Sequence, residues 1–220
     1  VPPLAALTLC ARGLDTPEKA SAFLDAGRGQ LLDPFLMKDM DRAAARVRRA
    51  LAAGEHIAVY GDYDVDGITS TCLLTDFLRR DGGTVIPYIP DRMEEGYGLN
   101  REAVAALRGQ GVGLIVTVDC GITAVEEAAC AASLGVELVI TDHHECKAAL
   151  PAAAAVVDPR RAGCPYPFKC LAGVGVALKL VLALGGPARR DELLERLSEA
   201  ANSFVNGEDF VPWQYNLGLY

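Results

Sequence analysis

The chain has 220 residues, 51% of them hydrophobic, and a formal net charge of −8 at pH 7. This length suffices for one large domain with a sizeable core, and no stretch approaches the roughly 18 apolar residues of a membrane span, which excludes a membrane protein. The negative charge counts against nucleic-acid binding, although a cluster of metal-binding carboxylates would also raise the negative count.

Cysteine usage and the N-terminus indicate the compartment. The seven cysteines are odd in number, irregularly spaced and without a C-x-x-C pair, which argues against a zinc ribbon or a disulfide framework. No targeting signal is visible, and the chain begins at Val1 rather than Met, so we expect a processed sequence or a part of a longer one. Reduced thiols are typical of a cytoplasmic protein, and that is the location we expect.

Residues 1–52 predict a helical cap. A capping pattern at Thr16 begins one helix, and residues 39–51 have apolar side chains at three- and four-residue spacing. The other face of this second helix carries four arginines: Arg42, Arg46, Arg48 and Arg49. We interpret them as a solvated helix face, with a phosphate-steering surface as the alternative.

Residues 53–185 alternate strands with helices. Strands are expected over residues 56–60, 84–89, 114–118, 137–140 and 154–157, and helices over residues 68–80, 100–107, 123–134 and 174–184. This order predicts an α/β fold with a doubly wound, mainly parallel sheet flanked by helices. Residues 186–220 are a C-terminal tail of unclear role.

Acidic residues and histidines follow three of the expected strands: Asp62, Asp64 and Asp66 after the first, Asp119 after the third, and Asp142, His143 and His144 after the fourth. Ligands bind outside the carboxyl ends of parallel strands, so we expect these side chains to converge in one crevice. His56 opens a strand at the other end and is interpreted as structural.

The chemistry of these clusters favours metal binding. Carboxylates two residues apart in an extended segment face the same way and repel each other unless cations lie between them. Carboxylate and imidazole ligands without a thiolate pair suit manganese or magnesium, and two such ions can clamp a phosphoryl group. The alternative is that the acids form turns and helix caps, which for Asp62 alone is as good an explanation but does not account for all three clusters.

The three clusters resemble the motifs of the DHH family of phosphodiesterases. Residues 61–67 are similar to its first motif, Asp119 to its second, and Asp142-His143-His144 to the motif that names it. Residues 32–40, 88–99 and 171–177 further resemble segments of the RecJ branch of this family, the single-stranded-DNA-specific exonucleases. The resemblance covers roughly residues 30–185.

This resemblance implies a DHH phosphodiesterase domain over residues 53–185. It also implies a two-metal hydrolase, with manganese or magnesium, that degrades single-stranded DNA from 5′ to 3′ in DNA repair and recombination. A single-strand-binding protein and a helicase are candidate partners of the intact system. Two alternatives stay open: a DHH phosphoesterase for a small substrate (an oligonucleotide, a cyclic dinucleotide or pyrophosphate), and a non-catalytic DHH-fold binding module.

The resemblance also assigns roles to residues. It implies that Asp64 and Asp66 each hold one metal, that Asp119 bridges the two, and that His143 is a ligand. His144 would be a ligand, a phosphate binder or a proton donor. Two further acids complete the set: Asp142 as the partner that orients a histidine, and Asp62 as a ligand or a nearby acidic group.

Three residues are candidates for phosphate binding. Arg92 either binds a phosphate or forms a loop salt bridge, while Gly173 and Gly175 either let backbone amides approach a phosphate or form a tight turn. The family's last Asp ligand has no evident counterpart. Asp191 and Asp209 are the nearest acids, but Asp191 is better explained as a helix N-cap and Asp209 as part of a turn. The sequence therefore predicts an incomplete, weakly active enzyme.

Overall fold

A computed structural model describes residues 1–24, 31–91, 93 and 95–205, with side chains described as far as residue 197. The chain divides into two compact units, Val1–Asp33 and Pro34–Tyr220. The first unit contains two helices, α1 (Pro3–Ala11) and α2 (Pro17–Leu24), of which α2 begins at the capping pattern that Thr16 indicated. This division lies earlier than the boundary expected after residue 52, because the helix that follows, α3 (Met40–Ala53), packs against the main unit.

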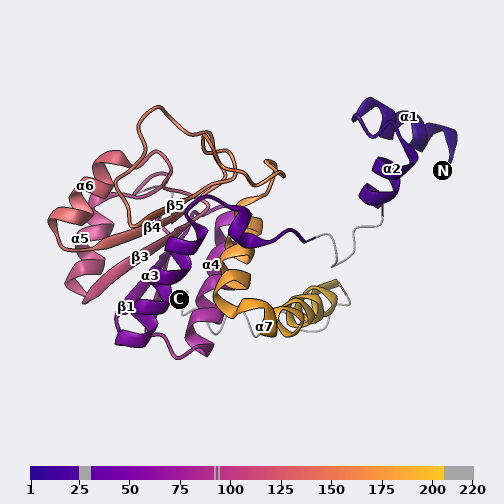
Figure 1. Cartoon of the computed structure of the whole chain (residues 1–220). Helices are drawn as coiled ribbons and strands as arrows, with labels where there is room; N and C mark the ends of the chain where they lie inside the picture. Colours follow the sequence, from indigo (N-terminus) through magenta and orange to yellow (C-terminus); the bar gives the residue numbers. More distant parts are fainter. Residues whose placement is uncertain (25–30, 92, 94, 206–220) are drawn as a thin grey trace. The chain divides into compact units, whose positions relative to one another are not determined.

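The second unit is a five-stranded sheet with helices on both faces (Figure 1). After α3 its elements are β1 (His56–Tyr60), α4 (Val65–Arg80), β2 (Val85–Tyr88), α5 (Arg101–Gly109), β3 (Val112–Val118), α6 (Val125–Ser133), β4 (Glu137–Thr141), β5 (Ala155–Val157) and α7 (Gly173–Val205), with a short 3₁₀ helix, η2 (Pro34–Leu36), before α3. All pairings are parallel, in the order β2-β1-β3-β4-β5. The predicted α/β fold is confirmed.

Burial on both faces explains why these segments form central parallel strands. In β3 the residues from Leu114 to Val118 are all buried, as expected of a strand covered on both sides. Helices α5 and α6 cover one face, where Val104, Leu107 and Ala128 join Ile115 in one core cluster. On the other face, α7 packs against both α3 and α4 (Figure 1).

The strand order places a switch point between β1 and β3. From β1 the chain moves to β2 on one side and then returns to β3 on the other. At such a point the connections diverge and leave a crevice at the carboxyl ends of the strands, where α/β proteins bind ligands. The loops after β1 and β3 begin with the first two acidic clusters.

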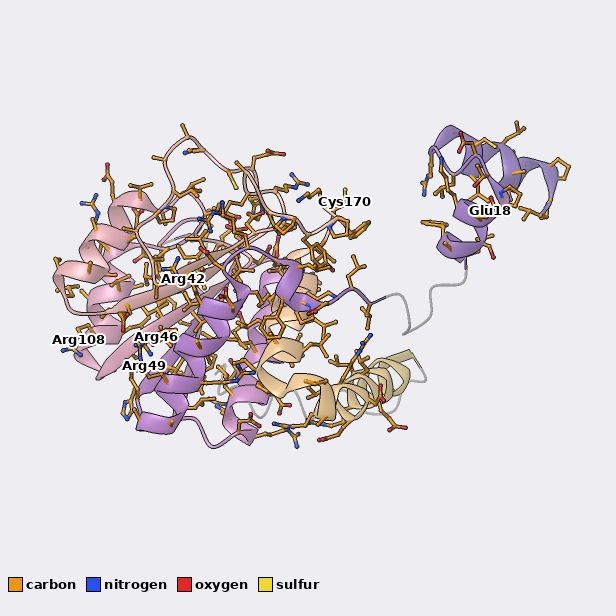
Figure 2. The ribbon with its side chains drawn as sticks, in the orientation of Figure 1. Glu18, Arg42, Arg46, Arg49, Arg108 and Cys170 are labelled. Carbon is orange, nitrogen blue, oxygen red and sulfur yellow. The ribbon has the colours of Figure 1, made fainter. Side chains whose placement is uncertain are left out.

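The arginine face of α3 matches the predicted solvated face except at one position: Arg42, Arg48 and Arg49 are exposed, whereas Arg46 is buried (Figure 2). Arg46 is only 5% exposed. Its guanidinium donates to Glu137 at 2.8 Å and to Glu55 at 2.8 and 2.9 Å. Arg48 donates to the backbone carbonyls of residues 183 and 184, which ties α3 to α7. Arg46 and Arg48 are therefore structural residues, because acids and carbonyls from other segments accept their hydrogen bonds.

Helix α7 is longer than expected. We predicted its end at residue 184, but helical structure continues to Val205 across a kink at Gly186, which has a φ of 70° and is followed by Pro187. Asp191 lies within the second segment, so the predicted N-cap role is wrong. Asp209 lies outside the described residues. No described helix is both long enough and apolar enough to cross a membrane, and all seven cysteines are free thiols.

Candidate metal centre

The predicted convergence of acids and histidines is confirmed at the carboxyl edge of the sheet. Two groups of potential ligands meet there: Asp62, Asp64 and Asp119 form one, and Asp119, His143 and His144 form the other. In each group one ligand atom per residue lies within 4.8 Å of the others. Asp119 belongs to both groups and therefore occupies the position of a shared, bridging carboxylate.

Asp119 is held in an unfavourable state by its surroundings. Its backbone has a φ of 60°, a left-handed conformation that Asp tolerates better than most residues. Its side chain is 1% exposed, and Oδ1 has no hydrogen-bond partner among the described residues. The Nε2 atom of His143 is 3.0 Å away, but the contact lacks hydrogen-bond geometry.

The pKa of Asp119 also shows that its ionised form is unfavourable. Burial, followed by the charges of Asp66 and Asp64, raises the pKa of Asp119 to about 8. A buried carboxylate oxygen without a partner is rare, and a cation between the two groups would provide one and restore the ionised form. The donors are carboxylate oxygens and imidazole nitrogens, which fit manganese or magnesium.

The loop after β1 positions Asp62 and Asp64. Asp64 is the N-cap of α4, where its Oδ1 accepts from the Gly67 amide at 2.9 Å. Asp62 is buried, and its Oδ1 accepts from the Tyr63 amide at 2.7 Å. A Cβ at Gly67 would lie 2.4 Å from the backbone oxygen of Asp62, so only glycine permits this turn. The capping explanation therefore holds for Asp64, which is nevertheless also a member of a metal-ligating group.

Asp66 has a contact that the sequence did not predict. Its two carboxylate oxygens accept from the amides of Gly173 and Val174, each at 2.7 Å, at the N-terminus of α7. It lies outside both metal-ligating groups, although His143 Nε2 is 3.7 Å from its Oδ2. Metal binding by Asp66 stays a prediction; the observed contact is an anchor for α7 that uses the positive end of the helix.

Two glycines at the start of α7 were expected to bind phosphate or form a turn. The Gly173 amide is occupied by Asp66, and a Cβ at this position would lie 2.3 Å from Asp119 Oδ1. Glycine is therefore required here because α7 approaches the acidic cluster so closely. A Cβ at Gly175 would meet only the side chain of Leu171, at 3.0 Å. Phosphate binding by both glycines stays a prediction, and Arg92 lies outside the described residues.

Each histidine is oriented through its Nδ1 atom. His143 Nδ1 is 2.9 Å from the Leu171 carbonyl, which can only accept, so Nδ1 carries a proton, and Nε2 faces Asp119. His144 Nδ1 is 2.7 Å from Asp142 Oδ1. This hydrogen bond and the charge of Asp142 raise the pKa of His144. The expected role of Asp142 as an orienting partner is therefore matched by its geometry.

Asp142 is itself fixed by backbone amides. It is 1% exposed and accepts from the amides of Ile122 at 2.9 Å, His143 at 2.7 Å and His144 at 3.1 Å. Burial would raise the pKa of Asp142, but the hydrogen bonds from His144 and from the amides outweigh it and the pKa is lowered. The carboxylate is thus ionised and rigid, which fixes the His144 ring.

Asp158 and Tyr97 were not among the residues predicted from the sequence. Asp158 follows β5, is fully buried, and has an Oδ2 without a hydrogen-bond partner in the described chain. Burial is the main cause that raises its pKa to about 6. Its position after a predicted strand, like that of the other acids, was the signal that could have found it. Tyr97 places its hydroxyl 3.3 Å from His144 Nε2, in a loop whose path the sequence does not reveal.

Comparison with known proteins agrees with this geometry. The chain matches the N-terminal domain of the DHH family over residues 56–204. It is 49% identical over 195 residues to the single-stranded-DNA-specific exonuclease RecJ of Bacillus subtilis (strain 168), covering 89% of this chain and 25% of the relative. It is 40% identical over 227 residues to RecJ of Thermus thermophilus, covering 100% of this chain and 33% of the relative. The chain thus spans a quarter to a third of these relatives.

Solved structures give the same result. Exonuclease RecJ bound to manganese is similar with a TM-score of 0.64 and 34% identity, over 82% of this chain and 46% of that chain. RecJ from Thermus thermophilus in complex with Mn²⁺ is similar with a TM-score of 0.60 and 34% identity, over 88% of this chain and 30% of that chain.

Proposed function

The chain belongs to the DHH family, and from this premise we propose that it is the metal-binding part of a phosphodiesterase that degrades single-stranded DNA stepwise from the 5′ end. The observation that carries the proposal is the position of Asp119. It is shared by two groups of potential ligands and has a buried oxygen without a partner in the described structure.

Manganese or magnesium would be the cofactor, in two positions. Asp62 and Asp64 would hold one ion and His143 the other, with Asp119 between them and with Asp66 as the further ligand that the resemblance implies. Two bound cations supply charge stabilisation for a transferring phosphoryl group and lower the pKa of a water. The manganese-bound RecJ structures support this choice of metal.

The residues of this chain would prepare the site for that chemistry. The Leu171 carbonyl and Asp142 fix the two imidazole rings, so that both Nε2 atoms face the site without rearrangement. His144, whose pKa is raised by its hydrogen bond to Asp142, could contact a phosphate oxygen or protonate the leaving oxygen. Such preorganised polar groups reduce the reorganisation that the reaction requires.

The DNA substrate and the polarity rest on the similarity to the RecJ exonucleases. The chain spans a minority of their length, so a complete protein is needed to grip a strand and act on it. The setting we propose is DNA repair and recombination in the cytoplasm, which seven free cysteines support. A single-strand-binding protein and a helicase are proposed partners on the resemblance alone.

The test is a nuclease assay on a full-length protein that carries this chain. With manganese, it should release nucleotides from the 5′ end of a 3′-labelled single strand, and duplex DNA should resist. Asp119→Ala should abolish release, because both cations lose their shared ligand. His56→Gln, at the opposite end of β1 from the site, is the matched control and should retain activity. Wild-type turnover by Asp119→Ala would contradict the proposal.

The same preparations distinguish the two alternatives. A small-substrate enzyme would hydrolyse a dinucleotide, a cyclic dinucleotide or pyrophosphate faster than a long single strand. A non-catalytic module would leave every substrate intact and would bind no manganese tightly. We expect the single strand to be the preferred substrate.

A further inference from the structure

The Glu95 carboxylate joins the two ends of the loop between β2 and α5. We propose that Glu95 is a positioning residue that sets the His144 side chain by holding Tyr97 against it. The catalytic consequence rests on the proposed function; the structural part does not.

Glu95 collects donors from both ends of its loop. Its Oε2 accepts from the Tyr88 hydroxyl at 2.6 Å, at the end of β2, and from the Asn100 side-chain amide at 3.0 Å, at the start of α5. Its Oε1 accepts from the Asp91 amide at 3.0 Å, and the Glu95 amide donates to the Asp91 carbonyl at 2.9 Å. Glu95 therefore joins both elements that flank the loop.

A second set of contacts ties the same loop to β1. The Asn100 amide also donates to the Tyr60 hydroxyl at 3.2 Å, which in turn donates to the Gly98 carbonyl at 2.9 Å. The Tyr60 and Tyr88 rings stack with centroids 5.1 Å apart. Burial and the bond to Glu95 raise the pKa of Tyr88 to about 12, which keeps its hydroxyl a donor. The position of residues 95–98 is thus tied to two strands of the sheet.

Tyr97 is the residue of this segment that reaches the site. Its hydroxyl lies 3.3 Å from His144 Nε2, and its ring meets the His144 ring edge-on, with centroids 6.1 Å apart. On its other side it makes a similar edge contact with Tyr63, at 6.3 Å. Tyr97 is 58% exposed, so packing alone does not fix it. The loop must place it.

Asp142 and Tyr97 act on opposite nitrogens of the same ring. Asp142 accepts at Nδ1, so in the neutral ring Nε2 is the acceptor and the Tyr97 hydroxyl donates to it. The imidazole is then fixed at both ends. Losing either contact would let the ring rotate about its remaining bond. Glu95 acts on His144 indirectly, because it positions the backbone of Tyr97.

The first test is nuclear magnetic resonance of imidazole nitrogens in the 220-residue chain without metal. The chain has three histidines, so His144 can be assigned by comparison with His144→Gln. Tyr97→Phe should shift His144 Nε2 and leave His143 in place. Glu95→Ala should reproduce that shift, and adding Tyr97→Phe to it should cause no further shift.

Two more variants keep the test decisive. Tyr88→Phe removes one donor to Glu95 and should give a smaller shift in the same direction, which decides the matter if Glu95→Ala fails to fold. Glu102→Ala, an exposed glutamate in the first turn of α5, should shift nothing. An unchanged His144 resonance in folded Glu95→Ala, or an additive shift in the double variant, would overturn the proposal.

The second test measures turnover in the full-length protein. Tyr97→Phe and Glu95→Ala should lower kcat by a similar factor, and the double variant should be no slower than either. A purely structural Glu95 would instead lower the fraction of active protein, and its effect would add to that of Tyr97→Phe. If the wild-type protein cleaves no single-stranded DNA, the proposed function fails, whereas the resonance test still decides the role of Glu95.

Discussion

At the scale of single residues, Asp119 couples the metal site to stability. Its pKa is raised to about 8 in the metal-free protein, above the ordinary 3.8. The folded state therefore binds the extra proton, and its contribution to stability is full below about pH 4 and is lost as the pH rises towards 8. Without metal, the free energy of unfolding should fall over that range.

Asp119→Asn should remove this pH dependence. With a chelator present, urea unfolding at about pH 8 should find the variant more stable than the wild type, on the order of a few kcal/mol, because the buried charge is gone. Asp158→Asn is the matched control: its pKa is raised to about 6, so it should affect only the lower part of the range. If the free energy of unfolding depends on pH equally in the wild type and in Asp119→Asn, ionisation of Asp119 does not destabilise the folded protein and the prediction is wrong.

Gly173 should affect metal binding only because its lack of a side chain leaves room for the Asp119 carboxylate. A methyl group in Gly173→Ala would meet the Asp119 carboxylate and push it or α7 away. We expect manganese affinity to drop at least about tenfold, as for other displaced ligands. Gly175→Ala meets only a flexible leucine side chain and should bind manganese normally. Normal manganese affinity in Gly173→Ala would mean that α7 yields without disturbing Asp119.

The convergence of the candidate ligands could be predicted from the sequence because each follows a strand, and parallel strands end at one edge. Asp66 was predicted with them, but its bonds to α7 could not be, since its partners are 107 and 108 residues away. Tyr97 and Glu95 were missed because their roles depend on the path of an irregular loop.

At the scale of elements, Asp66 joins α4 to α7. In Asp66→Asn one acceptor oxygen replaces two and the charge at the helix N-terminus is lost, which should destabilise the protein by about 1–3 kcal/mol. The comparison belongs at about pH 5, where Asp119 is protonated and its repulsion with Asp66 is absent. Asp64→Asn is the control, because Asn caps a helix as well as Asp. A loss no greater than that of Asp64→Asn would contradict the anchoring role.

Two features of the helices could not be predicted from the sequence. Gly185-Gly186-Pro187 ends a helical pattern by every local rule, yet α7 resumes after a kink at Gly186. The arginines of α3 have an ordinary surface pattern, but Arg46 is buried and pairs with Glu137 at the start of β4. For Arg46, a contact that is distant in sequence decides the outcome.

At the scale of the whole molecule, the strand order explains the site. The switch between β1 and β3 brings the Asp62–Asp66 loop beside Asp119, and β4 adds the histidines from the next position in the sheet. The meeting of these side chains at one edge of the sheet followed from the alternation of strands and helices. The family's last Asp ligand has no counterpart among the described residues, so we expect the isolated chain to bind one cation well and the second weakly.

The most direct test of the account is a calorimetric titration of the 220-residue chain with manganese, in parallel with Asp119→Asn and His56→Gln. We predict one tight and one weak binding event for the wild type and for His56→Gln. Asp119→Asn should lose both, because one carboxylate serves both positions. Wild-type binding by Asp119→Asn would contradict the central claim that Asp119 is the shared ligand of a two-metal site.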